Sequence, residues 1–152
     1  MVAGDWWPIV PTATVGPPRL ADGVVGRPAL VSRLLAARGG DLVTITAPAG
    51  YGKTTVATLW AAADRRPFAW MRIDHLDADP AHLLLHIAAA VDTVSGLDPE
   101  ALRYLRGPGR PALTHALPTL IRALETCGPL VVLLDDLQEL TASAAVDALR
   151  AF

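Results

Sequence analysis

The segment from Ala47 to Thr55 (APAGYGKTT) contains residue types whose spacing suits phosphate binding. It fits the P-loop, or Walker A, pattern G-x-x-x-x-G-K-S/T with one departure, because Ala47 stands in the place of the first glycine. Gly50 and Gly52, on either side of Tyr51, allow the backbone to curl so that successive N–H groups point inward at phosphate oxygens. The spacing therefore predicts a loop that holds the phosphates of a nucleotide.

Three side chains directly after the second glycine complete the predicted site. Lys53 is the only lysine among the 13 Lys and Arg residues, and a mobile ammonium at this position reaches the β- and γ-phosphates and assists catalysis. The hydroxyl of Thr54 is placed to ligate Mg²⁺, and Thr55 is placed to contact the α-phosphate. We therefore expect ATP and Mg²⁺ as ligands; the alternative is an ordinary connection between a strand and a helix.

An acidic pair follows an apolar run later in the chain. The residues from Leu130 to Leu134 lead directly into Asp135 and Asp136. A carboxylate at the carboxyl end of a parallel strand faces the crevice where α/β sheets bind ligands. We expect Asp135 to hold the magnesium through water and Asp136 to polarise the attacking water if hydrolysis occurs. Gln138 and Glu139 are alternatives for that base, and a solvated Asp-Asp turn is the alternative without chemistry.

The elements that must position these residues follow from hydrophobic periodicity and from turn residues. Strands alternating with helices predict an α/β fold with a mostly parallel sheet. An irregular, proline-rich lead-in is expected over residues 1–22. Buried strands are expected over Leu42–Ala47, Pro67–Ile73 and Leu130–Leu134. Helices are expected from Arg27 to Gly39, Lys53 to Ala63, Asp79 to Val94, Pro99 to Leu105, Ala112 to Cys127 with a kink or restart at Pro118, and from Ser143 onward.

Composition excludes several classes of protein. The chain has 152 residues, 52% hydrophobic and 18% charged, which suits one domain with a core. Its longest apolar strand run is far shorter than the roughly 18–20 residues of a membrane span, and the N-terminus lacks the basic start of a secretory signal. We therefore expect a cytoplasmic protein that contacts no membrane. The net charge of −2 predicts no basic face for nucleic acid.

The four histidines are expected not to form a metal site. His82 and His86 have the i, i+4 spacing of a helical ligand pair, while His75 and His115 stand apart. A metal site needs further ligands, and no third ligand is evident near the pair. We therefore expect these side chains on the surfaces of helices.

Several strings together resemble one family of ATPases. The P-loop string and "LVVLLDDLQEL" are similar to those of signal-transducing (STAND) ATPases, and above all to the N-terminal ATPase domain of large LuxR-type transcriptional activators. "VVGRPALVSRL" resembles the segment that abuts the adenine in this family, which implies that Val25, Gly26 and Arg27 lie beside the base. "FAWMRIDHLDADPAHLLLHIAAAV" resembles the family's Trp-containing strand, its Asp-rich turn and the helix that follows.

The resemblance implies a three-layer P-loop NTPase fold over residues 23–152 and a nucleotide-dependent switch with slow ATP hydrolysis at most. Full-length members self-associate and contact DNA through a C-terminal helix-turn-helix, which is not visible in this chain. In the family, the strand between the P-loop strand and the acidic strand comes later in the chain. We therefore expect a fragment with an incomplete sheet that folds poorly alone. The alternatives are a catalytic AAA+-like P-loop ATPase and a non-functional truncated remnant; the segments around Trp70 and Arg27 favour the regulatory module.

Overall fold

The computed structural model describes residues 16–20, 22–37, 40, 42–107 and 111–152. Most of the expected lead-in over residues 1–22 lies outside these ranges. In the described chain, the sheet consists of two parallel strands, β1 (Phe68–Arg72) and β2 (Val131–Asp135). They run in register from Phe68 opposite Val131 to Arg72 opposite Asp135. Their carboxyl ends therefore meet at one edge, where the sequence places its acidic pair.

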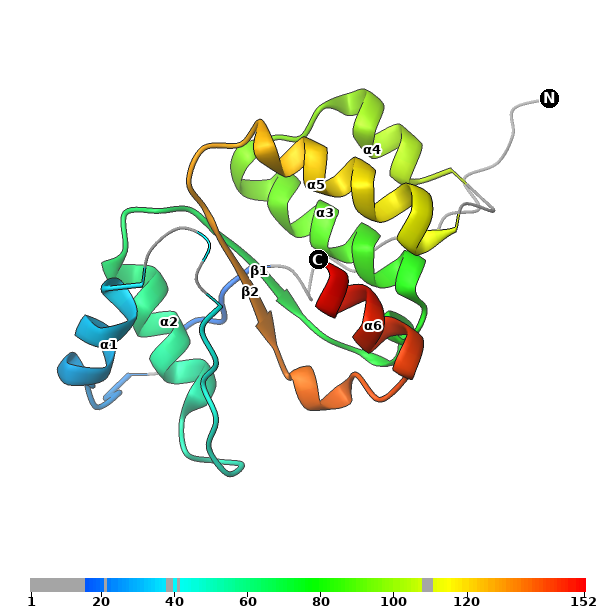
Figure 1. Ribbon diagram of the computed structural model, residues 1–152. Helices are drawn as coiled ribbons and strands as arrows, with labels where there is room; N and C mark the ends of the chain where they lie inside the picture. The colour runs from blue at the N-terminus through cyan, green and yellow to red at the C-terminus, as the bar shows by residue number, and fades with distance from the viewer. Residues whose placement is uncertain (1–15, 21, 38–39, 41, 108–110) are drawn as a thin grey trace.

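The strand pair lies between two layers of helices (Figure 1). On one side lie α1 (Pro28–Leu35) and α2 (Lys53–Ala63). On the other side lie α3 (Pro80–Ser95), α4 (Pro99–Leu105), α5 (Leu117–Glu125) and α6 (Ser143–Ala151). This arrangement confirms the α/β, three-layer P-loop fold with an incomplete parallel sheet. Across the described ranges, no helix has both the length and the apolar character needed to cross a lipid bilayer.

The first four residues of strand β1 are buried, and its side chains alternate between the two faces of the sheet. Ala69 and Met71, both 0% exposed, belong to the main core that also includes most of the buried face of α3. Phe68 and Trp70 are buried outside that cluster, as the two-residue period of a strand requires. The Phe68 ring meets the Trp60 ring of α2 edge to face, with the ring centroids 5.0 Å apart. This pair packs α2 against the sheet.

Local signals set the ends of α3, the helix with the most buried residues. Asp79 precedes it and accepts a hydrogen bond from the Ala81 N–H, and Pro80 occupies the first turn. Gly96 ends it with a φ of 66°, a left-handed value that glycine adopts without steric cost. Before α3 lies a 3₁₀ turn, η2 (His75–Ala78), which is closed by a reciprocal capping box between Asp74 and Asp77.

The predicted restart of the helix at Pro118 is confirmed. A π-helical turn, η3 (Ala112–Ala116), comes first, and α5 then begins with Pro118 in its first turn. Proline fits this position because its missing N–H has no intrahelical partner in the first turn. After β2, a short 3₁₀ turn, η4 (Leu137–Glu139), leads toward α6.

The prediction of a buried strand over Leu42–Ala47 is wrong. The structure assigns no strand to residues 42–47, and Leu42 is 92% exposed. An apolar, β-branched run forms a strand only where a neighbouring strand pairs with its N–H and C=O groups. The described sheet consists of β1 and β2, and residues 42–47 pair with neither of them. It nevertheless leads into the loop that the sequence predicts.

Candidate functional site

The predicted phosphate loop has a left-handed backbone conformation at both of its glycines. Gly50 and Gly52 have φ values of 80° and 79°, in the left-handed region that favours glycine. A Cβ at Gly50 would meet no atom within 4 Å, so the backbone conformation, not crowding, requires glycine there. Gly52 stands at the N-terminus of α2 and has no side chain to cap it. The first N–H groups of α2 and its positive dipole end are thus available to a phosphate.

The ammonium of Lys53 folds back over this loop. Its Nζ donates to the carbonyl oxygen of Ala47 at 2.9 Å and to that of Pro48 at 3.2 Å. Both contacts tie the start of the loop to the first residue of α2. A phosphate bound at this loop offers a charged acceptor, which makes stronger hydrogen bonds than a carbonyl does. The lysine is therefore held by partners that a nucleotide can replace.

The two expected magnesium ligands contact each other across 81 positions of sequence. Thr54 Oγ1 lies 3.1 Å from Oδ1 and 3.0 Å from Oδ2 of Asp135, to which it donates a hydrogen bond. The carboxylate is further oriented by the backbone N–H of Asp136 at 3.1 Å. Hydroxyl and carboxylate oxygens are the ligands that Mg²⁺ prefers in proteins. The oxygens present at the start of α2 and the end of β2 fit such an ion.

Asp136, the expected base, is held by two side chains. Its Oδ2 lies 2.7 Å from Nε of Arg72, and its Oδ1 accepts from Nε2 of Gln138 at 3.0 Å. These contacts, from Gln138 and then Arg72, hold the pKa of Asp136 below its usual value despite some burial. Asp136 also has a φ of 58°, a left-handed value that aspartate adopts more readily than most non-glycine residues. No motif in the sequence indicates this role for Arg72, which the strand register places at the same edge as the acidic pair.

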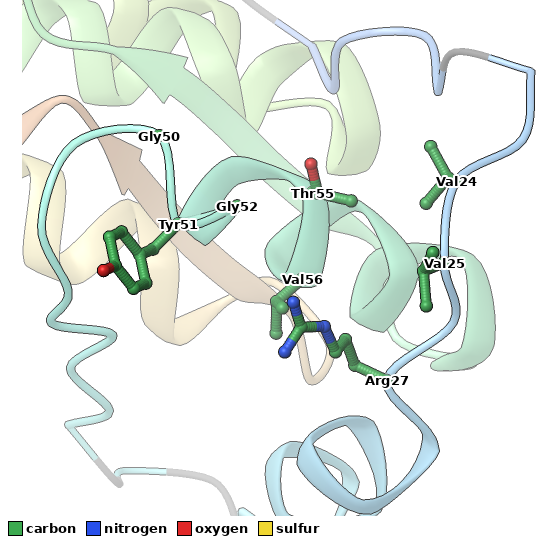
Figure 2. A pocket seen from close by; sticks show the side chains of 8 residues that line it. All are labelled: Val24, Val25, Arg27, Gly50, Tyr51, Gly52, Thr55 and Val56. Carbon is green, nitrogen blue, oxygen red and sulfur yellow. The ribbon is translucent and has the colours of Figure 1, made fainter.

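A pocket of about 430 Å³ opens beside the loop (Figure 2). It is lined by Val24, Val25, Arg27, Gly50, Tyr51, Gly52, Thr55 and Val56. Six of these residues are among the predicted nucleotide-binding residues, and they come from two segments that the fold brings together. Volumes of this size are typical of small-molecule sites. Lys53 and Thr54 do not line the pocket, but they lie next in the chain after Gly52.

The expected surface position of His82 and His86 is wrong. Both are buried, with 8% and 0% of their surface exposed, and both contact the fully buried Asp77 of η2. Burial would raise the pKa of Asp77, but the hydrogen bonds from both histidines outweigh it and hold this pKa well below its usual range. The hydrogen bond to Asp77 raises the pKa of His82 against the opposing effect of burial. The histidine spacing gives no sign of Asp77, because this residue lies in a separate turn, η2.

The fold and the loop define an α/β domain of the P-loop class. The AAA ATPase domain family matches residues 24–152, which is most of the chain. The chain belongs to this family. The expected resemblance to the N-terminal ATPase domain of a LuxR-type activator is confirmed by the relatives described next.

Those relatives are transcription regulators of the genus Yersinia. The chain is 30% identical over 146 residues to the HTH-type transcriptional regulator MalT of Yersinia enterocolitica. It is 31% identical over 146 residues to the proteins of the same name from Yersinia pestis and Yersinia pseudotuberculosis. Each alignment covers 95% of this chain and 16% of the relative. The chain thus spans about a sixth of the length of these curated relatives.

Proposed function

We propose that this domain binds ATP with Mg²⁺ and acts as a nucleotide-dependent switch in a transcription regulator. The observation that carries the proposal is the contact between Thr54 and Asp135, which assembles two Mg²⁺-type ligands at the start of α2. The adjoining pocket and the glycine loop supply room for a nucleotide and N–H donors for its phosphates. The family membership and the similarity to regulators named MalT support the regulatory context.

Each predicted residue has a role in this proposal. Gly50, Tyr51 and Gly52 form the phosphate loop, and Lys53 leaves the carbonyls of Ala47 and Pro48 to contact the β- and γ-phosphates. A bound Mg²⁺ would neutralise the charge of the phosphates. Thr54 would ligate this ion, Asp135 would hold it through water, and Thr55 would contact the α-phosphate. Val25 and Arg27 line the pocket on the side proposed for the adenine.

The hydrogen bonds that hold the Asp136 carboxylate favour a nucleotide-dependent switch rather than a fast ATPase. A general base must be free to accept a proton from the attacking water. Both oxygens of Asp136 already accept hydrogen bonds, and the lowered pKa makes the carboxylate a weaker base. ATP would therefore be hydrolysed slowly at most. Self-association and DNA contact, if the domain works within a longer regulator, would be controlled by the bound nucleotide.

The test is the magnesium dependence of ATP affinity. A fluorescent ATP analogue is titrated with Mg²⁺ and with EDTA against the wild-type chain, Thr54→Val and Thr54→Ser. We expect Mg²⁺ to strengthen binding to the wild type and to Thr54→Ser, which keeps the hydroxyl. Thr54→Val should lose most of the Mg²⁺ effect while it keeps its binding in EDTA. An equal Mg²⁺ effect in all three proteins would refute the assigned role of Thr54.

A further inference from the structure

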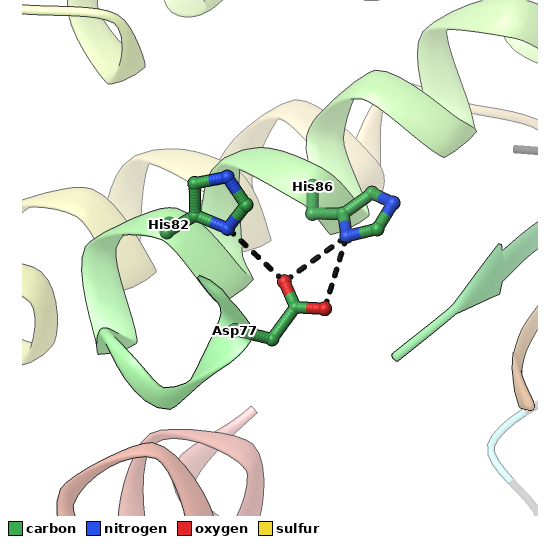
Figure 3. Close-up of side chains that lie close together, drawn as sticks. All are labelled: Asp77, His82 and His86. Atoms are coloured by element: carbon green, nitrogen blue, oxygen red, sulfur yellow. Dashed lines mark hydrogen bonds and ion pairs between the residues drawn. The ribbon is translucent and has the colours of Figure 1, made fainter. Parts of the chain in front are cut away.

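Three buried side chains converge on one point beyond the end of β1 (Figure 3). Asp77 comes from η2, and His82 and His86 project from successive turns of one face of α3. Nδ1 of His82 lies 3.2 Å from Oδ1 of Asp77, and Nδ1 of His86 lies 3.0 Å from the same oxygen. Both imidazoles thus direct the same kind of nitrogen at the same carboxylate. The arrangement supplies the third ligand that the spacing of the histidines did not reveal.

The separations among these atoms fit a small divalent cation. The ligand atoms of Asp77, His82 and His86 all lie within 4.8 Å of one another. Atoms at the corners of a tetrahedron about 2.0–2.1 Å from zinc are about 3.3 Å apart. The nitrogen–oxygen separations here are already close to that value. Imidazole nitrogen and carboxylate oxygen are both common zinc ligands, and a histidine pair at i, i+4 on a helix is a frequent source of two of them.

Burial and charge also favour a cation at this point. Asp77 and His86 are 0% exposed, and the ion pairs that Asp77 makes with described residues are to these two histidines. The negative charge of Asp77 lies away from water, so it needs a positive partner. An imidazolium of His82 or His86 can be that partner, and a divalent cation bound to neutral imidazoles would take its place.

The surroundings of the cluster resemble those of metal ligands. The backbone N–H of Asp74 donates to Oδ2 of Asp77 at 2.9 Å and fixes the orientation of the carboxylate. Hydrogen-bonded carboxylates are typical of metal sites because such bonds orient the ligand. The His82 side chain is 9% exposed, and its buried Nε2 has no hydrogen-bond partner in the described structure. A metal-bound histidine usually donates its second ring N–H to an acceptor or to water, so this nitrogen would need a water as its partner.

We propose that Asp77, His82 and His86 form a Zn²⁺ site with three protein ligands, in which the two Nδ1 atoms and the carboxylate bind the ion and a water is the fourth ligand. The ion would join η2 to α3 and stabilise the junction that follows β1. This proposal does not depend on the nucleotide-binding proposal, since it shares no ligand with the P-loop or the acidic pair.

The test uses Co²⁺ as a spectroscopic substitute for Zn²⁺ on the purified chain, with excess Mg²⁺ present to fill the proposed nucleotide site. We expect one equivalent of Co²⁺ to bind with the visible absorption of a four-coordinate ion, and Zn²⁺ to displace it and raise the melting temperature. His82→Gln should weaken Co²⁺ binding by at least about tenfold, whereas the exposed-histidine control His115→Gln should bind as the wild type does. Absence of stoichiometric Co²⁺ binding in folded wild type, or equal binding by His82→Gln, would overturn the proposal.

A second measurement on the wild type avoids variants that fail to fold. Two-dimensional ¹H–¹⁵N correlation of the histidine rings distinguishes a metal-bound Nδ1 from one that carries a proton. We expect Zn²⁺ to change the Nδ1 signals of His82 and His86 and to leave those of His75 and His115 unaffected. If Zn²⁺ leaves the His82 and His86 signals unchanged, the cluster is a hydrogen-bonded cap of η2 and the proposal is wrong.

Discussion

Arg72 and Asp136, 64 positions apart in the chain, form an ion pair of 2.7 Å at the carboxyl edge of the sheet. The pair exists because β1 and β2 run parallel and in register, so Arg72 lies opposite Asp135 and next to its neighbour. It engages an oxygen of the carboxylate that the sequence predicts as the catalytic base. The contact therefore links the topology of the sheet to the expected rate of ATP hydrolysis.

We predict that Arg72→Ala increases ATP turnover several-fold. Without the guanidinium, Asp136 Oδ2 is free to contact water, and the pKa of Asp136 moves back toward its usual value. The Arg72 side chain is 67% exposed, so its loss should change the free energy of unfolding by no more than about 1 kcal/mol. Steady-state phosphate release at saturating ATP measures the effect.

The matched control for this prediction is Arg103→Ala, which removes another exposed arginine, paired with Glu100 at 3.2 Å. Its turnover should equal that of the wild type. A fall in turnover specific to Arg72→Ala would contradict the prediction and would indicate that Arg72 assists hydrolysis.

A second prediction concerns acid stability. The hydrogen bonds from Arg66, together with one from the Trp60 ring, lower the pKa of Asp64 to about 2. A carboxyl whose pKa is lower in the folded state than in the unfolded state stabilises the fold above the unfolded pKa. This contribution is lost as the pH falls through the folded pKa. Asp64→Asn should therefore destabilise the chain at neutral pH by about 1.5–3 kcal/mol, the range for hydrogen bonds to a charged group.

The pH dependence of that difference is the measurement. Urea unfolding of the wild type and of Asp64→Asn should give free energies that differ at pH 6 and converge between about pH 4 and pH 2. A difference that stays constant down to pH 2 would show that the amide, and not the lost charge, causes the destabilisation.

A third prediction compares the stability cost of a substitution in the core with that of one in residues 42–47, which form no strand. Leu84 of α3 is 0% exposed, and Leu84→Ala should cost about 2–5 kcal/mol through lost burial and a cavity. Leu42 is 92% exposed, and Leu42→Ala should change the stability by no more than about 0.5 kcal/mol. Chemical denaturation measures both variants. A cost above about 2 kcal/mol for Leu42→Ala would mean that residues 42–47 are packed in solution.

The helices could be predicted from the sequence because their signals are local. Pro80 and Gly96 at the ends of α3, and the start of α2 at Lys53, each follow from one or two residues and a hydrophobic period. The absence of a strand over Leu42–Ala47 could not be predicted in the same way, since strand formation depends on a partner from elsewhere in the chain. The expected poor folding of the isolated chain stays a prediction.

The same distinction between local and tertiary signals applies to the residues of the candidate site. The sequence motif indicated Lys53, Thr54 and Asp135, and the structure brings the last two into contact. The partners Arg72 and Asp77 were missed, because their roles depend on the register of β1 with β2 and on the turn before α3. Tertiary neighbours of this kind leave no periodic pattern in a single sequence.

The most direct test of the account is the affinity of ATP·Mg²⁺ for the wild type and for Lys53→Ala, measured by isothermal titration calorimetry. Arg150→Ala is the control, because it removes one positive charge from the exposed face of α6. The account predicts that Lys53→Ala weakens binding by at least about tenfold, or about 1.4 kcal/mol, while Arg150→Ala binds as the wild type does. Equal affinities of the wild type and Lys53→Ala would contradict the assignment of the loop as the phosphate site.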